Sequence, residues 1–578
     1  MRTVTSLDGI WRFVVDQNPK YHLDPVTCPL PFNARTDVCR RHWKDVIVPG
    51  CWQKYEERLD IYEGVCWYHR TFMLDALQPG ETAVVRFGAV NYACRVFVNG
   101  VEIGGHETGY TPFALDCTEV LREGENQISV CVDNRDAVTV WPHVVGYFNY
   151  GGIHRSVTLI RTGMGDMEDV RWDTAWQDGV GMLSVSGRIR GGKSRLKLSC
   201  GGAETEISAD ENGEFAASLS VQGAKPWSPE TPVLYDARLV AESGDTRENR
   251  CGFKSVCVEN GEVFLNGAPY RLHGVCHLSD NPDSGMTMTQ ENILRDLRLM
   301  KGCGVNAIRC HYPMDEKFYD ACDEMGFLVW IEPNIYCYHP RTEDRNTLFA
   351  DEKAKRLALQ MVEELVIPAR DHVCVSIYGI GNECNTANPE APAFFRAIAD
   401  TLRRDGGNRL ISYAALYGTV DGVFDLVDIV GINSYWGWYD KLDMAPDQDG
   451  WKAEAVQGDR EPIDLTPFHG MMQDVLKKIG GKKALLLTEF GADAVPGYFS
   501  RSREMWSEEY QADLIEEIIT TAKQYPQIMG TFVFAFEDYR DPSKDFNGYW
   551  NEWNLKGLVD YGRRPKKSYE AVKRCYQK

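Results

Sequence analysis

Two glutamates, Glu383 and Glu489, each stand directly after an apolar run that predicts a buried strand. Glu383 follows Ser376–Asn382, and Glu489 follows Leu485–Thr488. Cleavage of a glycosidic bond needs one carboxylic acid to protonate the leaving oxygen and one carboxylate to attack the sugar or to activate water. A separation of about 5–5.5 Å between the carboxyl groups would indicate retention, and about 6.5–9.5 Å inversion. The alternative interpretation is that each glutamate only pairs with a neighbouring base such as Arg309.

Polar side chains also end most of the other predicted strands. They are His273, His277, Arg309, His311, Glu332, Asn334, Asn382, Asn433 and Tyr435. The carboxyl ends of the strands line the active site of a parallel barrel, so these residues are candidates for one site. We predict that the Asn382 amide hydrogen-bonds a sugar 2-hydroxyl, and that Tyr435 donates to the nucleophile and keeps it ionised. Plain packing is the alternative for Tyr435.

Tryptophans near these strands offer ring faces to the C–H surface of a sugar, although the core is an equally good place for each of them. They are Trp436, Trp438, Trp550 and Trp553. The chain has no Cys-x-x-Cys pair and no His-Glu-x-x-His motif. We therefore expect no metal site and no cofactor.

The elements that must position these residues change in type near residue 257. Residues 257–578 alternate eight apolar runs with amphipathic stretches, which predicts a catalytic (β/α)8 TIM barrel. The expected strands are Arg271–Val275, Asn306–Arg309, Leu328–Glu332, Val375–Tyr378, Leu410–Tyr413, Ile429–Asn433, Ala484–Glu489 and Met529–Phe534. The expected helices are Glu291–Lys301, Asp315–Met325, Ala354–Val366, Pro392–Arg404 and Glu508–Gln524. A doubly wound open sheet is the alternative, but it needs a Gly-rich phosphate loop that this chain lacks.

The part of the chain before the barrel reads as β structure. Short alternating runs such as Ala83–Phe87, Arg95–Val98 and Gln127–Val132 are separated by turn signals. Residues 1–162 are therefore predicted to form a jelly-roll β-sandwich similar to sugar-binding domains. Residues 163–256 continue in the same pattern and have the length of one immunoglobulin-like β-sandwich.

Charge and composition narrow the range of partners. The 63 basic and 84 acidic residues give a net charge of −21, which argues against nucleic acid because a phosphate backbone needs clustered Lys and Arg. No stretch approaches the ~20 apolar residues of a membrane-spanning helix, and no leader pattern opens the chain. We therefore expect a cytoplasmic protein without a membrane partner, whose 18 cysteines stay reduced.

Several segments together resemble glycoside hydrolase family 2. They are Phe148–Val157, Asn306–Pro313, Ile380–Glu383, Asn433–Tyr439, Leu487–Gly491 and Met505–Gln511. The resemblance covers nearly the whole chain and implies a retaining enzyme, with Glu383 as acid/base and Glu489 as nucleophile. The sugar contacts expected with it come from Asn433, Tyr439, Trp438, Arg309, His311 and His277. Members of the family often form dimers or tetramers, so a homo-oligomer is expected.

The segment Asn554–Gly557 resembles the motif with which the uronidase branch of this family grips the sugar carboxylate. An amide and an ammonium, here Asn554 and Lys556, bind a carboxylate through charge-assisted hydrogen bonds. A neutral hydroxymethyl group would leave the ammonium unpaired. The similarity to the β-glucuronidases implies a terminal β-D-glucuronide, as a small molecule or an oligosaccharide, as the substrate.

Some residues depart from that pattern. Gly146 replaces an Asp that is the family's partner for the sugar 4-hydroxyl, Phe534 stands where Trp is frequent, and Trp550 stands where Arg is common. The stretch Glu332–His339 is more similar to the galactosidases of the family. Glucuronate and galacturonate differ only at C4, so a β-galacturonidase or a dual glucuronidase/galacturonidase is the main alternative. A neutral β-galactosidase and a non-catalytic carbohydrate-binding protein are the others.

Overall fold

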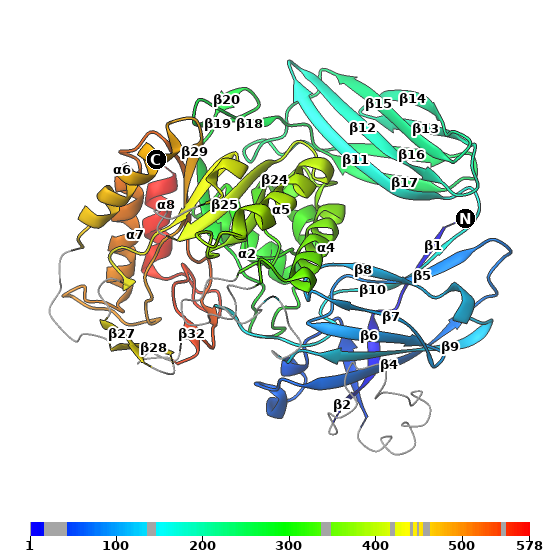
Figure 1. The fold of residues 1–578 in the computed structure, drawn as a ribbon, viewed down its shortest axis with the longest axis horizontal. Helices are drawn as coiled ribbons and strands as arrows, with labels where there is room; N and C mark the ends of the chain where they lie inside the picture. The colour runs from blue at the N-terminus through cyan, green and yellow to red at the C-terminus, as the bar shows by residue number, and fades with distance from the viewer. Residues whose placement is uncertain are drawn as a thin grey trace.

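A barrel surrounded by helices and two β-rich regions make up the protein (Figure 1). In Figure 1 the barrel fills the left half, the N-terminal β region lies at the lower right, and the second β region at the upper right. The computed structural model describes residues 2–16, 43–135, 141, 146–336, 348–416, 422–439, 443–447, 450–454, 463–544 and 551–577. Trp550 and residues 337–339, which were singled out above, lie outside the described residues.

Eight parallel strands close into a barrel. In barrel order they are β21 (Leu272–Cys276), β22 (Ala307–Cys310), β23 (Leu328–Ile331), β24 (Val375–Asn382), β25 (Leu410–Leu416), β26 (Ile429–Asn433), β29 (Ala484–Glu489) and β30 (Ile528–Val533). Most are buried along their whole length because both faces are covered. β30 returns to β21, where Leu272 pairs with Gly530. The predicted TIM barrel is confirmed, and the open-sheet alternative is wrong.

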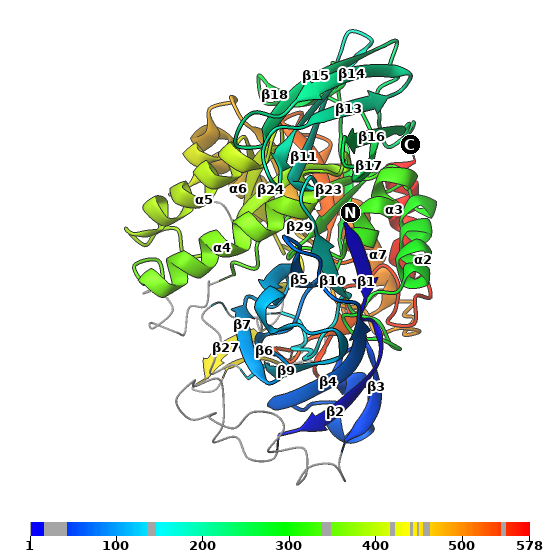
Figure 2. The same cartoon turned by 90° about the vertical axis from the view of Figure 1, so that its right-hand side faces the viewer.

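Helices surround the barrel, and Figure 2 shows α2 and α3 on one side of it with α4 and α5 on the other. The helices of the described residues are α2 (Gln290–Gly302), α3 (Glu316–Met325), α4 (Glu352–Ala369), α5 (Ala391–Asp405), α6 (Thr466–Ile479), α7 (Glu508–Ala522) and α8 (Lys567–Tyr576). All five expected helices are present, whereas α6 and α8 were missed. Pro467 is the second residue of α6, and Pro565 stands two residues before α8, so neither proline interrupts a helix interior.

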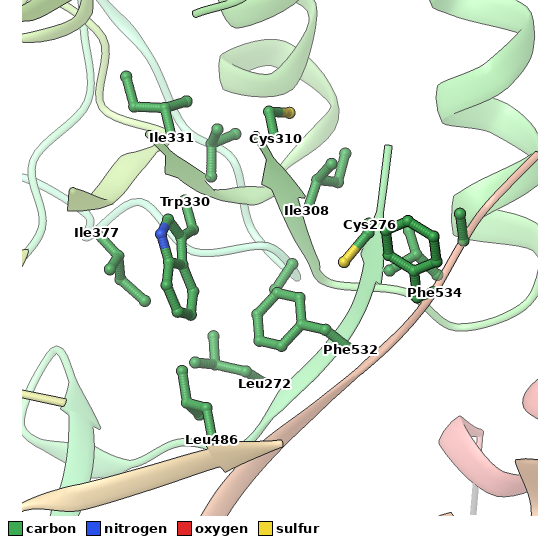
Figure 3. Close-up of a cluster of buried hydrophobic side chains, with 14 of the residues drawn as sticks. Leu272, Cys276, Ile308, Cys310, Trp330, Ile331, Ile377, Leu486, Phe532 and Phe534 are labelled. Atoms are coloured by element: carbon green, nitrogen blue, oxygen red, sulfur yellow. The ribbon is translucent and has the colours of Figure 1, made fainter. Parts of the chain in front are cut away.

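Apolar side chains fill the interior of the barrel, as Figure 3 shows for Leu272, Trp330, Ile377 and Phe532. The rings of Trp330 and Phe532 meet edge to face with centroids 5.9 Å apart. Gly274 makes room for this packing, because a Cβ there would lie 2.2 Å from the Phe532 ring. The barrel is therefore a packed core, and a site must form at the ends of its strands.

The N-terminal β region consists of two antiparallel sheets packed face to face. One has the order β3 (Lys44–Val48), β2 (Gly9–Val15), β4 (Val65–Leu74), β9 (Gly124–Asp133), β6 (Ala93–Val98) and β7 (Val101–Glu107). The other has the order β1 (Thr3–Ser6), β10 (Val157–Thr162), β5 (Thr82–Phe87) and β8 (Phe113–Asp116). Their inner faces share one core that includes Trp11, Tyr68 and Phe87. This arrangement agrees with the predicted sandwich.

The second β region is also a pair of sheets. One sheet contains β11 (Met167–Gln177), β12 (Val180–Ile189) and β15 (Glu214–Gln222). The other contains β14 (Ala203–Ser208), β13 (Arg195–Cys200), β16 (Tyr235–Ala241) and β17 (Thr246–Cys251). A small sheet of β18 (Val256–Glu259), β19 (Glu262–Leu265) and β20 (Ala268–Pro269) follows. The exact domain limits at residues 162 and 256 stay a prediction.

The N-terminal region is anchored on the barrel by the segment Phe148–Val157. Arg155 in this segment is buried and donates to Tyr110 O at 2.7 Å and to Pro313 O of the barrel. The ring of Tyr110 stacks on that of Tyr312 with centroids 4.3 Å apart. A motif that sequence analysis tied only to the family thus joins two regions of the molecule.

Two further findings concern membranes and metals. In the described part of the chain, each helix is too short or too polar to cross a membrane. Among the same residues, His, Cys, Asp and Glu side chains form no group of three or more that could hold a metal ion.

Candidate active site

The two glutamates lie at the carboxyl ends of two barrel strands. Glu489 is the last residue of β29, and Glu383 follows Asn382, the last residue of β24. The backbone of Glu383 has φ = 49°, a left-handed conformation that is uncommon for a residue with a side chain. Its N–H donates to Ala414 O of β25 at 2.9 Å, so the neighbouring strand holds this turn. Backbone outliers of this kind concentrate at functional sites.

Glu489 is almost completely buried and accepts hydrogen bonds from three side chains. Arg309 Nη1 lies 2.7 Å and His311 Nε2 3.0 Å from Oε1, and Tyr435 Oη lies 2.7 Å from Oε2. Burial by itself would raise the pKa of this carboxyl. The hydrogen bond from His311 and the charge of Arg309 outweigh burial and lower the pKa of Glu489 to about 2. This carboxylate is therefore ionised at neutral pH.

Glu383 has the opposite electrostatic environment. Tyr336 Oη donates to Oε2 at 3.0 Å, and Asn433 Nδ2 donates to Oε1 at 2.7 Å. Burial and then the negative charge of Glu489 raise the pKa of Glu383 to about 7, against the effect of these two hydrogen bonds. Two carboxyl groups whose pKa values are pushed apart in one site are suited to separate acid and nucleophile roles.

Arg309 is completely buried and joins the two halves of this network. Its guanidinium N–H groups have acceptors in Glu332 Oε1 and Oε2 at 2.8 and 3.2 Å, Asn382 Oδ1 at 2.8 Å, Glu489 Oε1 at 2.7 Å and Thr488 O at 3.4 Å. Because a guanidinium has five N–H groups, none is left over for a sugar. The alternative interpretation, in which Glu489 pairs with Arg309, is correct as geometry. The pair belongs to a network that also reaches the residue preceding Glu383.

The two asparagines of the site use their amides differently. Asn433 Nδ2 donates to Asn382 Oδ1 at 3.1 Å as well as to Glu383, and its Oδ1 accepts from Thr488 Oγ1 at 2.7 Å. Asn433 is thus fully engaged and orients Glu383. The amide oxygen of Asn382 is held by Arg309 and Asn433, so its NH2 group is the end that can meet a sugar hydroxyl.

The ammonium of Lys556 is completely buried among aromatic rings. Nζ lies 5.8 Å from the ring centroids of Tyr435 and Trp438 and 4.9 Å from that of Tyr439. Because Tyr435 also donates to Glu489, the ammonium is one aromatic ring away from that carboxylate. Lys556, which is predicted to bind the sugar carboxylate, therefore lies in the same site as Glu489, the predicted nucleophile.

Acidic groups hold Lys556 and Asn554, the predicted carboxylate ligands, in place. Lys556 Nζ donates to Asp493, and Asn554 Nδ2, in β32 (Trp553–Asn554), donates to Asp541 Oδ2 at 3.2 Å. Burial raises the pKa of Asp493, but the ammonium groups of Lys556 and Lys544 outweigh it and lower that pKa. The expectation that a neutral sugar would leave the ammonium unpaired is wrong, because Lys556 is already paired with Asp493.

Some residues predicted to contact the sugar are enclosed by protein. The His277 side chain is 0% exposed, and its Nδ1 lies 3.0 Å from Glu537 Oε2. Trp438 is equally buried, and its ring belongs to the surroundings of Lys556. The side chains of His277 and Trp438 therefore pack around the site inside the protein. His273 is the second residue of β21, so its assignment to the carboxyl end of a strand was wrong.

The structure adds three residues that sequence analysis did not assign to the site. Tyr336 contacts Glu383, Asp493 holds Lys556, and Lys544 Nζ donates to Tyr439 Oη. Asp493 could have been assigned from the sequence, since it stands only two residues beyond the family-like segment Leu487–Gly491. Lys544 could not, because a lysine in a loop is ordinarily solvated.

Two departures from the family pattern are visible in the structure. Gly146 has φ = 87°, and among the described residues no atom lies within 4 Å of a Cβ built there. None of those residues therefore occupies the space where the family carries an Asp. Phe534 is buried, with its ring centroid 5.8 Å from that of His311 and 6.3 Å from that of Tyr435. It forms an apolar wall beside His311 and Tyr435, which both contact Glu489.

Comparison with known proteins agrees with this architecture. Residues 256–578 match the family model "Glycosyl hydrolases family 2, TIM barrel domain", and residues 4–163 match "Glycosyl hydrolases family 2, sugar binding domain". A β-glucuronidase from Paenibacillus borealis is 26% identical over 98% of this chain and 95% of its own length. A β-glucuronidase from Mus musculus is 24% identical over 100% of this chain and 91% of its own length.

Solved structures are similar along the whole chain. A β-galacturonidase from Eisenbergiella tayi bound to galacturonate has a TM-score of 0.84 at 25% identity, with 100% of this chain and 97% of that chain covered. A β-glucuronidase from Ruminococcus gnavus in complex with D-glucaro 1,5-lactone has a TM-score of 0.86 at 23% identity, with 100% and 98% covered, which speaks for the fold alone. The resemblance seen in the sequence is confirmed: the chain belongs to glycoside hydrolase family 2 and is a glycoside hydrolase.

Proposed function

We propose that this enzyme is a retaining β-glucuronidase in which Glu489 is the nucleophile and Glu383 the acid/base. The observation that carries the proposal is the contrast between the two carboxyl groups. Three hydrogen-bond donors stabilise the ionised form of Glu489, whereas the pKa of Glu383 is raised to about 7. A retaining hydrolase needs this combination, a charged carboxylate that attacks and a neutral acid that gives up a proton.

In the first step, the carboxylate of a β-linked uronide binds to Lys556 and Asn554, and the sugar lies across the barrel mouth. The Asn382 NH2 group donates to an oxygen at C2. A Glu489 oxygen attacks C1 while Glu383 transfers its proton to the glycosidic oxygen, so the aglycone leaves as an alcohol. The product is a glycosyl ester on Glu489.

Formation of that ester changes the pKa of Glu383. The charge of Glu489 is one cause of the raised pKa, and this charge is lost in the ester. Glu383 therefore becomes a stronger acid as it loses its proton and remains ionised, ready to act as a base. It removes a proton from water, the water oxygen attacks C1, and the free sugar is released with net retention.

Recognition of the uronide rests on the aromatic pocket of the Lys556 ammonium. An ammonium surrounded by rings is poorly hydrated, so a carboxylate ligand gains more there than in water. The similarity to curated β-glucuronidases over nearly the full length supports the same substrate class. A small β-D-glucuronide or a terminal residue of an oligosaccharide is the proposed substrate, and a homo-oligomer is the proposed assembly.

A β-galacturonidase, or an enzyme of dual specificity, is the second candidate. Gly146 supports it, because the Asp that the family uses for the sugar 4-hydroxyl is absent and, in the part of the chain that the structure describes, no neighbour fills its space. The structural similarity to the Eisenbergiella tayi β-galacturonidase points the same way.

The test is kcat/KM on p-nitrophenyl β-D-glucuronide and β-D-galacturonide, with the β-D-galactoside as control. A preference for the glucuronide supports the proposal. A preference for the galacturonide overturns the choice of epimer but keeps the Lys556 site. A preference for the galactoside overturns the uronide assignment, and saturable sugar binding without release of nitrophenol overturns the proposed catalysis altogether.

A further inference from the structure

We propose that Lys544 is a second cation for the sugar carboxylate, acting beside Lys556. The inference deepens the proposed function and rests on it, since it presumes that the substrate is a uronide. Lys544 lies in the loop after β31 (Tyr539–Arg540). It is outside the segment Asn554–Gly557 that carries the family resemblance.

Two ammonium groups meet at one aromatic ring in this site. Lys544 Nζ lies 4.8 Å from the ring centroid of Tyr439, and Lys556 Nζ lies 4.9 Å from the same centroid. Lys544 also donates a hydrogen bond to Tyr439 Oη. The two cations therefore flank a single side chain, and a carboxylate with two oxygens can bind one ammonium with each of them.

Lys544 is held in this position although it belongs to a loop. It is only 6% exposed, whereas loop lysines ordinarily extend into water. Backbone bonds close the loop, from Asp541 N to Glu552 O at 2.8 Å and from Glu552 N to Lys544 O at 3.1 Å. The side chain is thereby directed into the protein rather than away from it.

Burial of a charge requires compensation, and the neighbours of Lys544 provide it. Burial lowers the pKa of Lys544, but Tyr439, Asp493 and Asp541 outweigh that effect and raise it. Asp541 also accepts the hydrogen bond from Asn554. The loop that carries Lys544 thus also holds Asn554, a predicted carboxylate ligand. Lys544 and Asn554 are therefore parts of one binding site.

Tyr439 connects this cation to the reacting end of the site. Because the Lys544 ammonium donates to Oη, the phenol proton of Tyr439 points elsewhere and is available to a ligand. The side chain is only partly buried, and its ring lies edge-on to Tyr435, with centroids 5.0 Å apart. Tyr435 in turn binds Glu489. A pyranose attacked at C1 by Glu489 carries C6 on the far side of the ring oxygen, toward the two lysines.

The test compares charged and neutral sugars in Lys544→Met, which keeps an unbranched apolar side chain of nearly the same length and removes the charge. We expect kcat/KM on p-nitrophenyl β-D-glucuronide to fall roughly 10- to 100-fold, mainly through KM, as for loss of one charge-assisted hydrogen bond. The rate on the neutral β-D-glucoside should change by less than about twofold. Lys544→Arg retains the charge and should recover part of the uronide activity.

The matched control is Lys567→Met. Lys567 also places its ammonium over a ring, 5.0 Å from the centroid of Phe499, but its side chain is 48% exposed and pairs with Glu509 on the surface. This variant should leave both substrates unaffected. Circular dichroism and thermal unfolding establish that the Lys544 variants are folded before kinetics are compared.

Several results would overturn the proposal. An equal loss on the glucuronide and the glucoside would mean that Lys544 only supports the fold of the site. No loss on either would mean that the carboxylate does not meet it. If the effect of Lys544→Met disappears in a Tyr439→Phe background, the lysine acts through the phenol alone. Failure of the proposed function looks different, because the unmodified enzyme would then prefer the neutral glycoside before any substitution.

Discussion

The two ends of the active site are built from different parts of the fold. Around Glu383 and Glu489 the side chains come from barrel strands, and Arg309 ties them into a network with every donor engaged. Around Lys556 the side chains come from loops beyond the strands, and most of them are aromatic. Under the proposed function, the barrel strands would position the reacting groups, whereas loops, which vary more readily, would determine which sugar binds.

Loss of the nucleophile should have the largest effect and should touch only the reaction end. Glu489→Gln keeps the shape of the side chain but cannot form the glycosyl ester. We expect kcat to fall by at least roughly 10⁴-fold, as when a catalytic nucleophile is removed, with binding of a uronic acid inhibitor retained. Stopped assays for kcat and calorimetry for binding measure the two separately. Activity near that of the unmodified enzyme would remove Glu489 from its role.

The recognition end should respond in a substrate-dependent way. Lys556→Met removes the buried ammonium, and we expect kcat/KM for β-D-glucuronides to fall by roughly 30- to 1000-fold, the worth of a desolvated charge pair. Asp493 then loses its buried salt bridge and keeps only the Leu555 N–H and the charge of Lys544, so Tm should fall as well. Neutral β-D-glucosides should be affected far less. An equal loss on charged and neutral substrates would erase the distinction between the two ends.

The pH profile should separate the two carboxyl groups of the reaction end. Glu383 must be protonated to act as an acid, so kcat/KM should decline as pH rises through its pKa of about 7. Tyr336 donates to Glu383 and stabilises the ionised form. Tyr336→Phe should therefore raise that pKa and move the alkaline limb to higher pH.

The paired variant acts on the other limb. Tyr435 donates to Glu489, so Tyr435→Phe should raise the pKa of the nucleophile and move the acid limb to higher pH, with the alkaline limb nearly unchanged. Kinetics between pH 3 and pH 9 measure both variants. If either one moves the limb assigned to the other, the division of roles between the two glutamates is wrong.

The smallest predicted effect concerns the sugar C4 position. Gly146→Asp restores the carboxylate that the family pattern carries, in a left-handed conformation that Asp tolerates better than most residues. We expect the ratio of glucuronide to galacturonide kcat/KM to change by roughly tenfold, about one hydrogen bond to a charged group reduced by backbone strain. Gly146→Ala imposes the same strain without the carboxylate and should leave the ratio unchanged.

Much of the fold could be predicted because the spacing of apolar residues along the sequence distinguishes strands from helices. All eight barrel strands were expected from continuous apolar runs, which strands buried on both faces require. Five of the seven helices of the described residues were expected too, from their amphipathic patterns. α6 and α8 were not assigned, although their lengths fall within the range of the helices that were.

The placement of Glu383 and Glu489 at strand ends could be predicted from the sequence, whereas their catalytic roles stay a prediction. Roles that depend on side-chain direction could not be predicted. Arg309 and His277 were expected to touch the sugar, but the structure surrounds both with acidic partners inside the protein. Tyr336 and Lys544 lie on loops, where the spacing of residues in the sequence does not predict which way a side chain points. Their contacts with Glu383 and Tyr439 follow only from tertiary structure.

The most direct test of the central claim is to trap the glycosyl ester. A 2-deoxy-2-fluoro-β-D-glucuronyl fluoride slows the second step more than the first, so the sugar should accumulate on the nucleophile. Peptide mass spectrometry of the inactivated enzyme should find one label, on Glu489, and NMR of the product from an ordinary substrate should show the β-anomer first. A label on another residue, or initial release of the α-anomer, would contradict this account.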